Sequence, residues 1–305
     1  MTCAAQSFAH RAFFYRGVQE YVAGTVPFVQ EGLAAGEPVA VAVPASNLGL
    51  LRAELGASAE QVQFTDMSRA GRNPGRIIPK VLLWFADAHL TERVRIIGEP
   101  IWPARTPAEY PACVQHEALI NKAFHGRNVS ILCPYDAVRL NAGRLADAFT
   151  THPVVIVGGR EERSAAYDAD GAVAAFNELL VRPRWAVVFT FDADRLPGAR
   201  DLAVGLAKRL GLPGERLDDF ALAVTELTTN SVRHGGGSGT VSVWGDGTQI
   251  VCEVRDRGWL RDPLAGRLPP QRDSPGGRGL LTVHHLADLV RIHTGPEGTT
   301  VRFSM

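Results

Sequence analysis

Short apolar runs alternating with longer amphipathic segments restrict the fold of the first half of the chain more than any other feature. The runs are rich in Val, Ile and aromatic residues, and they are Ala12–Tyr15, Val39–Val43, Val94–Ile97, Val129–Cys133 and Val154–Val157. The intervening segments predict helices at Val18–Leu33, Ser46–Leu55, Pro79–Leu90, Pro107–Ala123 and Ala142–Phe149. Buried strands separated by helices are typical of a parallel sheet covered on both faces. We therefore predict a doubly wound α/β domain.

The second half has a different order of elements. It predicts a strand, two helices, two strands, a Gly/Pro-rich loop from Arg257 to Gly277, a helix and two final strands. Strands grouped on one side of a few helices favour an α+β sandwich. A polar stretch that begins at Gly158 separates the halves. We therefore predict a domain over 1–160, a linker over 161–183 and a second domain over 184–305, in line with the length of 305 residues.

Composition excludes some classes of function. Lys plus Arg equals Asp plus Glu, at 32 each, so there is no overall basic field to favour a nucleic-acid partner. No apolar run approaches the ~20 residues that span a bilayer, and the N-terminus lacks the basic region of a signal peptide. We expect a cytoplasmic protein. The four cysteines are far apart and form no C-x-x-C pair, so we do not expect a zinc site or disulfides; three of them lie in apolar surroundings, where we expect small core residues.

One helical segment, Glu215 to His234, carries a polar face. Its apolar stripe consists of Leu217, Phe220, Val224 and Leu227, whereas Glu226, Asn230 and His234 lie four residues apart on another face. An amide oxygen is a suitable ligand for Mg²⁺ beside phosphates, and a carboxylate one turn away is suited to act as a base. The alternative for this face alone is simple solvation, with a histidine placed favourably at the helix C-terminus.

Three further pieces follow in order. Asp256-x-Gly258 ends a strand and could accept a hydrogen bond from an exocyclic amine, although D-x-G turns are common. Gly276-Gly277-Arg278-Gly279-Leu280 precedes a helix and could hold phosphate, or be a flexible loop. Gly298-Thr299 opens the last strand, where the hydroxyl could reach Asp256, or where Thr simply favours a strand.

As a set, these pieces resemble the GHKL (Bergerat-fold) ATPase superfamily over residues 184–305, and most closely the anti-sigma-factor serine/threonine kinases. The resemblance implies ATP and Mg²⁺ as cofactors, Glu226 as the catalytic base and Asn230 as the Mg²⁺ ligand. It places Asp256 against the adenine amine. It implies that ATP is also bound by residues of the two glycine boxes and the last strand, namely Gly258, Gly277, Arg278, Gly279, Leu280 and Thr299.

The first half resembles the MEDS sensory domain, a relative of RecA-type ATPases, over about residues 7–157. The resemblance rests on four sequence segments, namely His10…Tyr15, Gly98-Glu99-Pro100-Ile-Trp102, His116-Glu117…Asn121 and Cys133-Pro-Tyr-Asp136. No P-loop is present, so we do not expect ATP hydrolysis in this half. Glu99, Trp102 and Asp136 follow strand ends, where doubly wound folds bind ligands. They predict a small-molecule pocket, or alternatively residues that cap helices and tie loops.

The resemblance implies a cytoplasmic regulator that binds a sigma factor and phosphorylates a STAS-type antagonist under control of a small-molecule signal in the first domain. No direct nucleic-acid or membrane partner is expected, and a homodimer stays open. A non-catalytic ATP/ADP switch is the main alternative, because Pro263, Pro269, Pro270 and Pro275 stiffen the loop. A histidine kinase is the third. No histidine lies between His152 and His234, which points to an acceptor on another protein.

Overall fold

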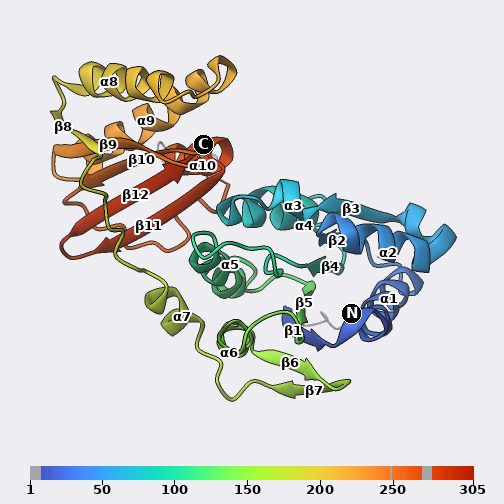
Figure 1. The fold of residues 1–305 in the computed structure, drawn as a ribbon. Helices are drawn as coiled ribbons and strands as arrows, with labels where there is room; N and C mark the ends of the chain where they lie inside the picture. Colours follow the sequence, from blue (N-terminus) through green and yellow to red (C-terminus); the bar gives the residue numbers. More distant parts are fainter. Residues whose placement is uncertain (1–7, 248, 270–276) are drawn as a thin grey trace. The chain divides into compact units, whose positions relative to one another are not determined.

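The computed structural model of the protein describes residues 8–247, 249–269 and 277–305, which form two compact units (Figure 1). The first unit ends at Phe176 and the second begins at Asn177. Each unit has its own sheet and its own core. Within the described ranges, no helix combines the length and the apolar character needed to cross a membrane.

A seven-stranded sheet organises the first unit. Its strands are β1 (Ala9–Tyr15), β2 (Val39–Val43), β3 (Val62–Asp66), β4 (Val94–Gly98), β5 (Val129–Asp136), β6 (Val154–Val157) and β7 (Arg160–Arg163). The spatial order is β3-β2-β4-β5-β1-β6-β7. All neighbours pair in parallel except β6 and β7, which form an antiparallel hairpin at one edge.

Helices connect the parallel strands, as parallel pairing requires. The α-helices are α1 (Gly17–Ala34), α2 (Ala45–Leu55), α3 (Met67–Ala70), α4 (Leu83–Asp87), α5 (Tyr110–Ala123), α6 (Ala142–Thr151) and α7 (Ala169–Ala175). Two 3₁₀ turns lie at η1 (Gly56–Gln61) and η2 (Pro74–Arg76), and a π-helical turn, η3 (Ile78–Leu82), runs into α4.

Strand β1 shows how the two faces of this sheet are covered. Phe13 and Tyr15 belong to the core under α1 and α2, together with Tyr21 of α1. Phe14 lies on the opposite face and stacks on Phe149 of α6, with ring centroids 4.7 Å apart. Alternate residues of one strand therefore enter two cores, which is the doubly wound arrangement that the sequence predicts.

The structure differs from the sequence prediction at the sheet edges. Strand β3 was not predicted, and only Val62 of its five residues is buried, because β3 is an edge strand with a weak apolar signal. Strand β7 was not predicted either, since all four of its residues are exposed. Together β7 and α7 occupy much of the stretch that we assigned to a linker over 161–183.

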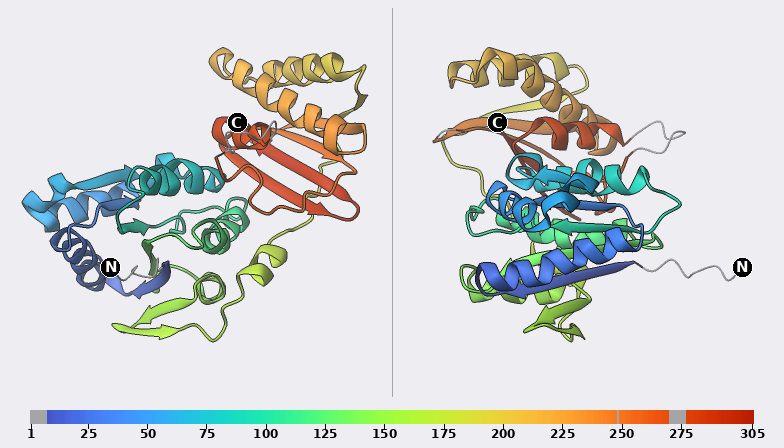
Figure 2. Two further views of the ribbon diagram at one scale, coloured as in Figure 1. Left: turned by 180° about the vertical axis from the view of Figure 1, so that it is seen from behind. Right: turned by 90° about the vertical axis from the view of Figure 1, so that its right-hand side faces the viewer.

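The second unit is an antiparallel sheet with helices on one face (Figures 1 and 2). Its strands are β8 (Val187–Asp192), β9 (Ser238–Asp246), β10 (Gln249–Asp256), β11 (Leu289–Gly295) and β12 (Gly298–Ser304), in the order β11-β12-β10-β9-β8. Its helices are α8 (Leu196–Arg209), α9 (Gly214–His234) and α10 (Arg278–Leu286). This is the sandwich expected from the sequence.

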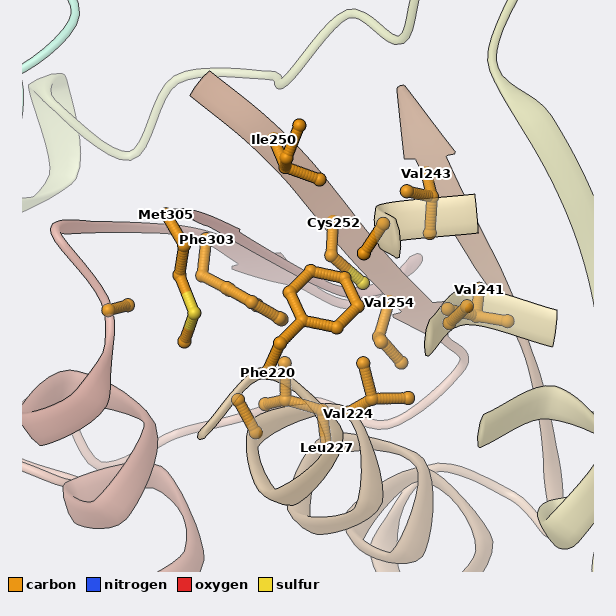
Figure 3. Packing of buried hydrophobic residues seen from close by; sticks show 14 of the residues in the cluster. Phe220, Val224, Leu227, Val241, Val243, Ile250, Cys252, Val254, Phe303 and Met305 are labelled. Carbon is orange, nitrogen blue, oxygen red and sulfur yellow. The ribbon is translucent and has the colours of Figure 1, made fainter. Parts of the chain in front are cut away.

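The core of the second unit lies between α9 and the sheet. Phe220, Val224 and Leu227 of α9 point toward Cys252 and Phe303 on the central strands (Figure 3). Apolar residues recur at positions three and four apart along α9, so one face of the helix is buried along its length. Burial of this stripe fixes how α9 rotates about its axis, and therefore where its polar residues point.

An ion pair connects the start of α9 to the segment just after α10. Arg216 at the start of α9 donates to Asp288, with Nη1 2.7 Å from Oδ2, and also to the carbonyl oxygen of Leu286. The pair is partly buried, which reduces screening by solvent. The two helices are therefore held at one end by Arg216, and they approach each other again where α10 begins.

Candidate functional site

The first turn of α10 lies against two polar side chains of α9. Glu226 and Asn230 are one helical turn apart and half-buried. A Cβ atom at Gly279 would lie 2.6 Å from Oε2 of Glu226 and 3.1 Å from Nδ2 of Asn230. Glycine at position 279 therefore allows the backbone of α10 to approach both side chains. His234, the third residue of the predicted polar face, lies exposed at the end of α9.

The carboxylate of Asp256 is held from two sides at the end of β10. The hydroxyl of Ser231 on α9 donates to Oδ2 at 2.6 Å, and the backbone N–H of Gly258 donates to Oδ1 at 2.8 Å. These bonds fix the orientation of the carboxylate and leave it further lone pairs as an acceptor. Ser231 was not predicted as a site residue. The sequence feature that could have identified Ser231 is a hydroxyl residue four positions after Leu227, on the buried face of α9.

Gly258 permits a close passage of the chain beside Asp256. A Cβ atom at this position would lie 2.6 Å from the carbonyl oxygen of His234 and 2.9 Å from Cα of Gly235. Backbone contacts of this kind leave no room for a side chain. The turn after β10 is therefore pressed against the C-terminus of α9, and both segments border the same space.

Thr299 supports the turn after β10 rather than the carboxylate directly. It lies opposite Asp256 in the pairing of β10 with β12. Its Oγ1 donates to the carbonyl oxygen of Gly258 at 2.7 Å and lies 3.3 Å from the backbone N–H of Leu260, which also donates to Thr294. The sequence predicted a hydroxyl that reaches Asp256, directly or through water. The direct hydrogen bonds of Thr299 go to the backbone beside Asp256.

A cavity of about 320 Å³ lies between α9, β10, the turn after β10 and the start of α10. Its apolar walls include Leu227, Val254, Leu280 and Val301, and its polar lining includes Asn230, Ser231, Asp256 and Thr299. An apolar cleft with a few fixed polar groups is typical of a small-molecule site. The walls can sandwich a planar ring whose edge meets Asp256.

Most of the predicted site residues meet at this cavity. Gly258, Gly277 and Gly279 line it, whereas Arg278 is exposed and does not. Gly277 has a φ of 91° and caps the start of α10, a conformation that favours glycine. Glu226 borders the site through its contact with Gly279. Gly276, Pro270 and Pro275, which the sequence analysis also named, lie outside the described residues.

The first unit holds a second cavity, of about 490 Å³, at the carboxyl ends of its parallel strands. Glu99, Trp102 and Asp136 all line it, as their positions after β4 and β5 predict. Tyr15, Tyr21 and Asn47 also line it, and sequence reasoning missed them. They belong to three separate segments, and only the folded sheet brings them together.

Glu99 is the most unusual group in the second cavity. It is 2 % exposed, and its Oε2 accepts hydrogen bonds from Nδ2 of Asn47 at 2.8 Å and from the Tyr21 hydroxyl at 3.5 Å. Burial raises the pKa of Glu99 to about 8, from an ordinary value of 4.5. The carboxyl group is therefore mostly protonated at neutral pH, and can donate a hydrogen bond.

Asp136 acts differently from Glu99. Its Oδ1 accepts the backbone N–H groups of Val138 and Arg139, each at 3.0 Å, and so closes the turn after β5. This matches the alternative in which such a residue ties a loop. Asp136 nevertheless lines the cavity, so it both shapes the turn and contributes charge to the pocket wall.

Comparison with known proteins gives a family for each half. Residues 9–153 match the model of the MEDS family, described as the methanogen/methylotroph, DcmR sensory domain. Residues 189–305 match the model of the histidine kinase-like ATPase domain. The chain thus carries a MEDS domain followed by a histidine kinase-like ATPase domain, and the five-stranded sandwich of the second unit is a Bergerat fold.

A search of the curated proteins gives no match to the chain. Among solved structures, the chain is similar to the RsbU and RsbW domains of a Mycobacterium tuberculosis protein, at 21% sequence identity and a TM-score of 0.30. The similarity covers 40% of this chain and 32% of that chain, so the chain spans about a third of this relative's length.

Proposed function

We propose that the protein is an ATP-dependent serine/threonine protein kinase of the anti-sigma type, controlled by its MEDS domain. The observation that carries the proposal is the cavity of the second unit, which is lined by the oriented carboxylate of Asp256. Beside this cavity, Glu226 and Asn230 of α9 lie against the first turn of α10. The match of residues 189–305 to the ATPase family supports ATP as the ligand.

The cavity fits the adenine end of ATP. Asp256 keeps acceptor capacity after its bonds to Ser231 and Gly258, and an adenine amine supplies the complementary donor. Leu280 and Val301 provide apolar walls for the ring. Thr299 holds the backbone of Gly258 in place, so the turn is preorganised before the nucleotide binds.

The phosphate end involves α9 and the start of α10. The side-chain oxygen of Asn230 would hold Mg²⁺, and the backbone N–H groups of Gly277 and Gly279, at the N-terminus of α10, would bind the phosphates. Bound Mg·ATP supplies the phosphoryl group. Glu226 accepts the proton of the attacking hydroxyl, which is the role of a catalytic carboxylate in phosphoryl transfer. Arg278 is exposed and able to turn toward a phosphate from outside the cavity.

The phosphorylated residue lies on a second protein. No histidine occurs between His152 and His234, and the described residues 177–186 before β8 form no helix that could present an acceptor. We therefore propose a Ser or Thr of a STAS-type antagonist as acceptor and a sigma factor as the alternative partner, in the cytoplasm. The glycine-lined edge of the site at α10 is where the acceptor hydroxyl would enter.

The signal enters through the first unit. The cavity around Glu99 is of small-molecule size and offers a protonated carboxyl group and the Tyr15 hydroxyl as donors, whereas Asn47 and Tyr21 donate to Glu99 itself. A small neutral or weakly polar compound with a hydrogen-bond acceptor matches these donors. Its binding would bias which partner the second unit holds.

A non-catalytic nucleotide switch is the second candidate. Pro263 and Pro269 lie in the described part of the loop after β10, where each fixes its own φ angle and limits how far the loop can rearrange. In this case ATP or ADP would alter partner binding without transfer of phosphate. Both candidates predict nucleotide binding, so only a measurement of transfer separates them.

The test is transfer of labelled phosphate from ATP to a STAS-type antagonist by the full-length chain. Glu226→Gln is expected to lower transfer by at least ~100-fold, the size of a general-base contribution, while ATP still binds. Glu215→Gln, an exposed change on the same helix, serves as the matched control. Full transfer by Glu226→Gln would exclude Glu226 as the base. Binding without transfer by the unmodified protein would favour the switch.

A further inference from the structure

Four metal-ligating side chains converge in the interior of the first unit, and none of them lines the cavity around Glu99. They are His10 of β1, Glu117 of α5, Cys133 of β5 and His152 just after α6. Their ligand atoms all lie within 4.8 Å of one another. None of the four is more than 1 % exposed. The four residues are spread over more than 140 positions, and the sheet topology alone brings them together.

Hydrogen bonds fix the orientation of both imidazole rings. Nδ1 of His152 lies 2.9 Å from the carbonyl oxygen of Ala148, so this nitrogen carries the proton. Nδ1 of His10 lies 3.1 Å from Oδ1 of Asn121, whose amide nitrogen donates to backbone carbonyls, including that of Thr151 at 2.8 Å. Both histidines therefore direct Nε2 toward the centre of the cluster.

One ring nitrogen of His152, Nε2, has no hydrogen bond in this arrangement. It is buried, and the nearest carboxylate oxygen, Oε2 of Glu117, is 3.6 Å away. A lone pair of Nε2 thus faces a carboxylate, and an unsatisfied buried polar group of this kind destabilises the folded state. Native interiors rarely retain such a group without an ion or water.

We propose that His10, Glu117, Cys133 and His152 bind a structural zinc ion. The spacing supports this assignment. Nε2 of His10 lies 3.2 Å from Oε2 of Glu117 and 3.4 Å from Sγ of Cys133, and that sulfur lies 3.6 Å from Oε2. Zinc bonds of about 2.0–2.3 Å in a tetrahedron place neighbouring ligand atoms about 3.3–3.7 Å apart. Three pairs among His10, Glu117 and Cys133 already have this spacing, as does Nε2 of His152 with Oε2 of Glu117 at 3.6 Å.

The groups around the four ligands also suit a zinc site. Zinc-bound histidines usually donate their second ring N–H to a carbonyl or carboxylate group, as His10 and His152 do here. The hydroxyl of Tyr135 donates to Oε1 of Glu117 at 3.1 Å, which leaves Oε2 for the metal. These outer contacts hold each ligand in the orientation that coordination requires.

Charge balance favours a divalent ion that accepts sulfur. The Cys133 thiol loses its proton to solvent when the sulfur–metal bond forms, and Glu117 supplies a carboxylate oxygen as ligand. One thiolate, one carboxylate, two neutral imidazoles and Zn²⁺ sum to zero, which avoids a net charge in the interior. Four protein ligands leave no open position, so the role is structural: the ion ties β1 and β5 to α5 and the end of α6.

The test is metal analysis of the full-length chain, prepared with Zn²⁺ and then dialysed. One zinc ion per chain is expected, and the X-ray absorption fine structure should show one sulfur at about 2.3 Å and three nitrogen or oxygen atoms at about 2.0–2.2 Å. A sulfur neighbour distinguishes this site from the ATP site, which offers only oxygen and nitrogen. Absence of retained zinc, or a shell without sulfur, would overturn the proposal in favour of a proton shared between His10 and Glu117.

Variants locate the site within the chain. Co²⁺-loaded protein should show a thiolate-to-cobalt charge-transfer band that disappears in Cys133→Ser and persists in Cys113→Ser. Cys113 is a suitable control, because it is an equally buried cysteine of the same unit, on α5. An unchanged band in Cys133→Ser would also contradict the proposal. The absorption measurement on the unmodified chain decides the question even if a variant does not fold.

Discussion

The buried carboxyl group of Glu99 makes the stability of the first unit depend on pH. Its pKa in the folded state is about 8, whereas the unfolded chain titrates near 4.5. Between these values the folded state holds one more proton than the unfolded state, so stability falls as pH rises, by about 1.4 kcal/mol per pH unit. Below pH ~4.5 the titration of Glu99 does not lower the free energy of unfolding. Above pH ~8 it has lowered that free energy by about 5 kcal/mol.

Glu99→Gln removes this titration and keeps the hydrogen bonds. The amide oxygen of glutamine can still accept from Asn47 and Tyr21. At pH 5 the variant should therefore match the unmodified protein within ~1 kcal/mol. By pH 8 the variant should be more stable by roughly 4–5 kcal/mol, because it has no carboxylate to ionise on unfolding.

The assay is urea unfolding from pH 5 to 9, followed by hydrogen exchange of the peptide that covers β4, which reports on the first unit alone. Glu54→Gln, an exposed change on α2, controls for the general effect of losing a negative charge. A stability difference between Glu99→Gln and the unmodified protein that stays constant across this pH range would refute the reasoning. It would show that Glu99 is ionised in the folded state.

Three further predictions concern the second unit. Asp256→Asn should weaken ATP binding by about 10–100-fold in calorimetry, because a hydrogen bond to a charged group is worth ~1.5–3 kcal/mol; unchanged affinity would remove Asp256 from the base site. Phe220→Ala should lower unfolding free energy by ~3–5 kcal/mol through a core cavity, whereas exposed Leu222→Ala should change it little. Gly279→Ala should displace the Glu226 carboxylate, so transfer should fall without loss of thermal stability; equal losses of both would contradict this.

The interior strands and long helices were predictable because their signal is local. Val39–Val43 and Val154–Val157 are strands with the predicted bounds, and the two strand-rich halves have the predicted architectures. The edges were not predictable from apolar patterning, because an edge strand such as β7 buries nothing. A turn signal was nevertheless present: Gly158 and Gly159 both have positive φ angles, as a two-residue hairpin turn requires.

For the two cavities, too, the residues that follow a local sequence pattern were predictable, and those that only the fold brings together were not. Asp256, Gly258 and Gly279 were predicted to lie together because their order in the sequence follows the pattern of the ATPase family, and the structure places all three at one cavity. The partners of Glu99 could not, since Asn47 and Tyr21 lie 52 and 78 residues away along the chain. Cys133 was predicted as a core residue, and it is buried. Its neighbours His10 and His152 come from opposite ends of the first unit, so no spacing rule could have linked them to it.

The position of β1 has a consequence for the synthesis of the protein. β1 is made first, yet it pairs only with β5 and β6, and its partner residues begin at Ser130. At about 5–20 residues per second, the ribosome needs roughly 6–25 s to make the ~120 residues from the end of β1 to the end of β5. During that interval an apolar strand has both edges unpaired, which is the condition under which strands mispair. The sheet of the first unit therefore cannot close around β1 until β5 has been made.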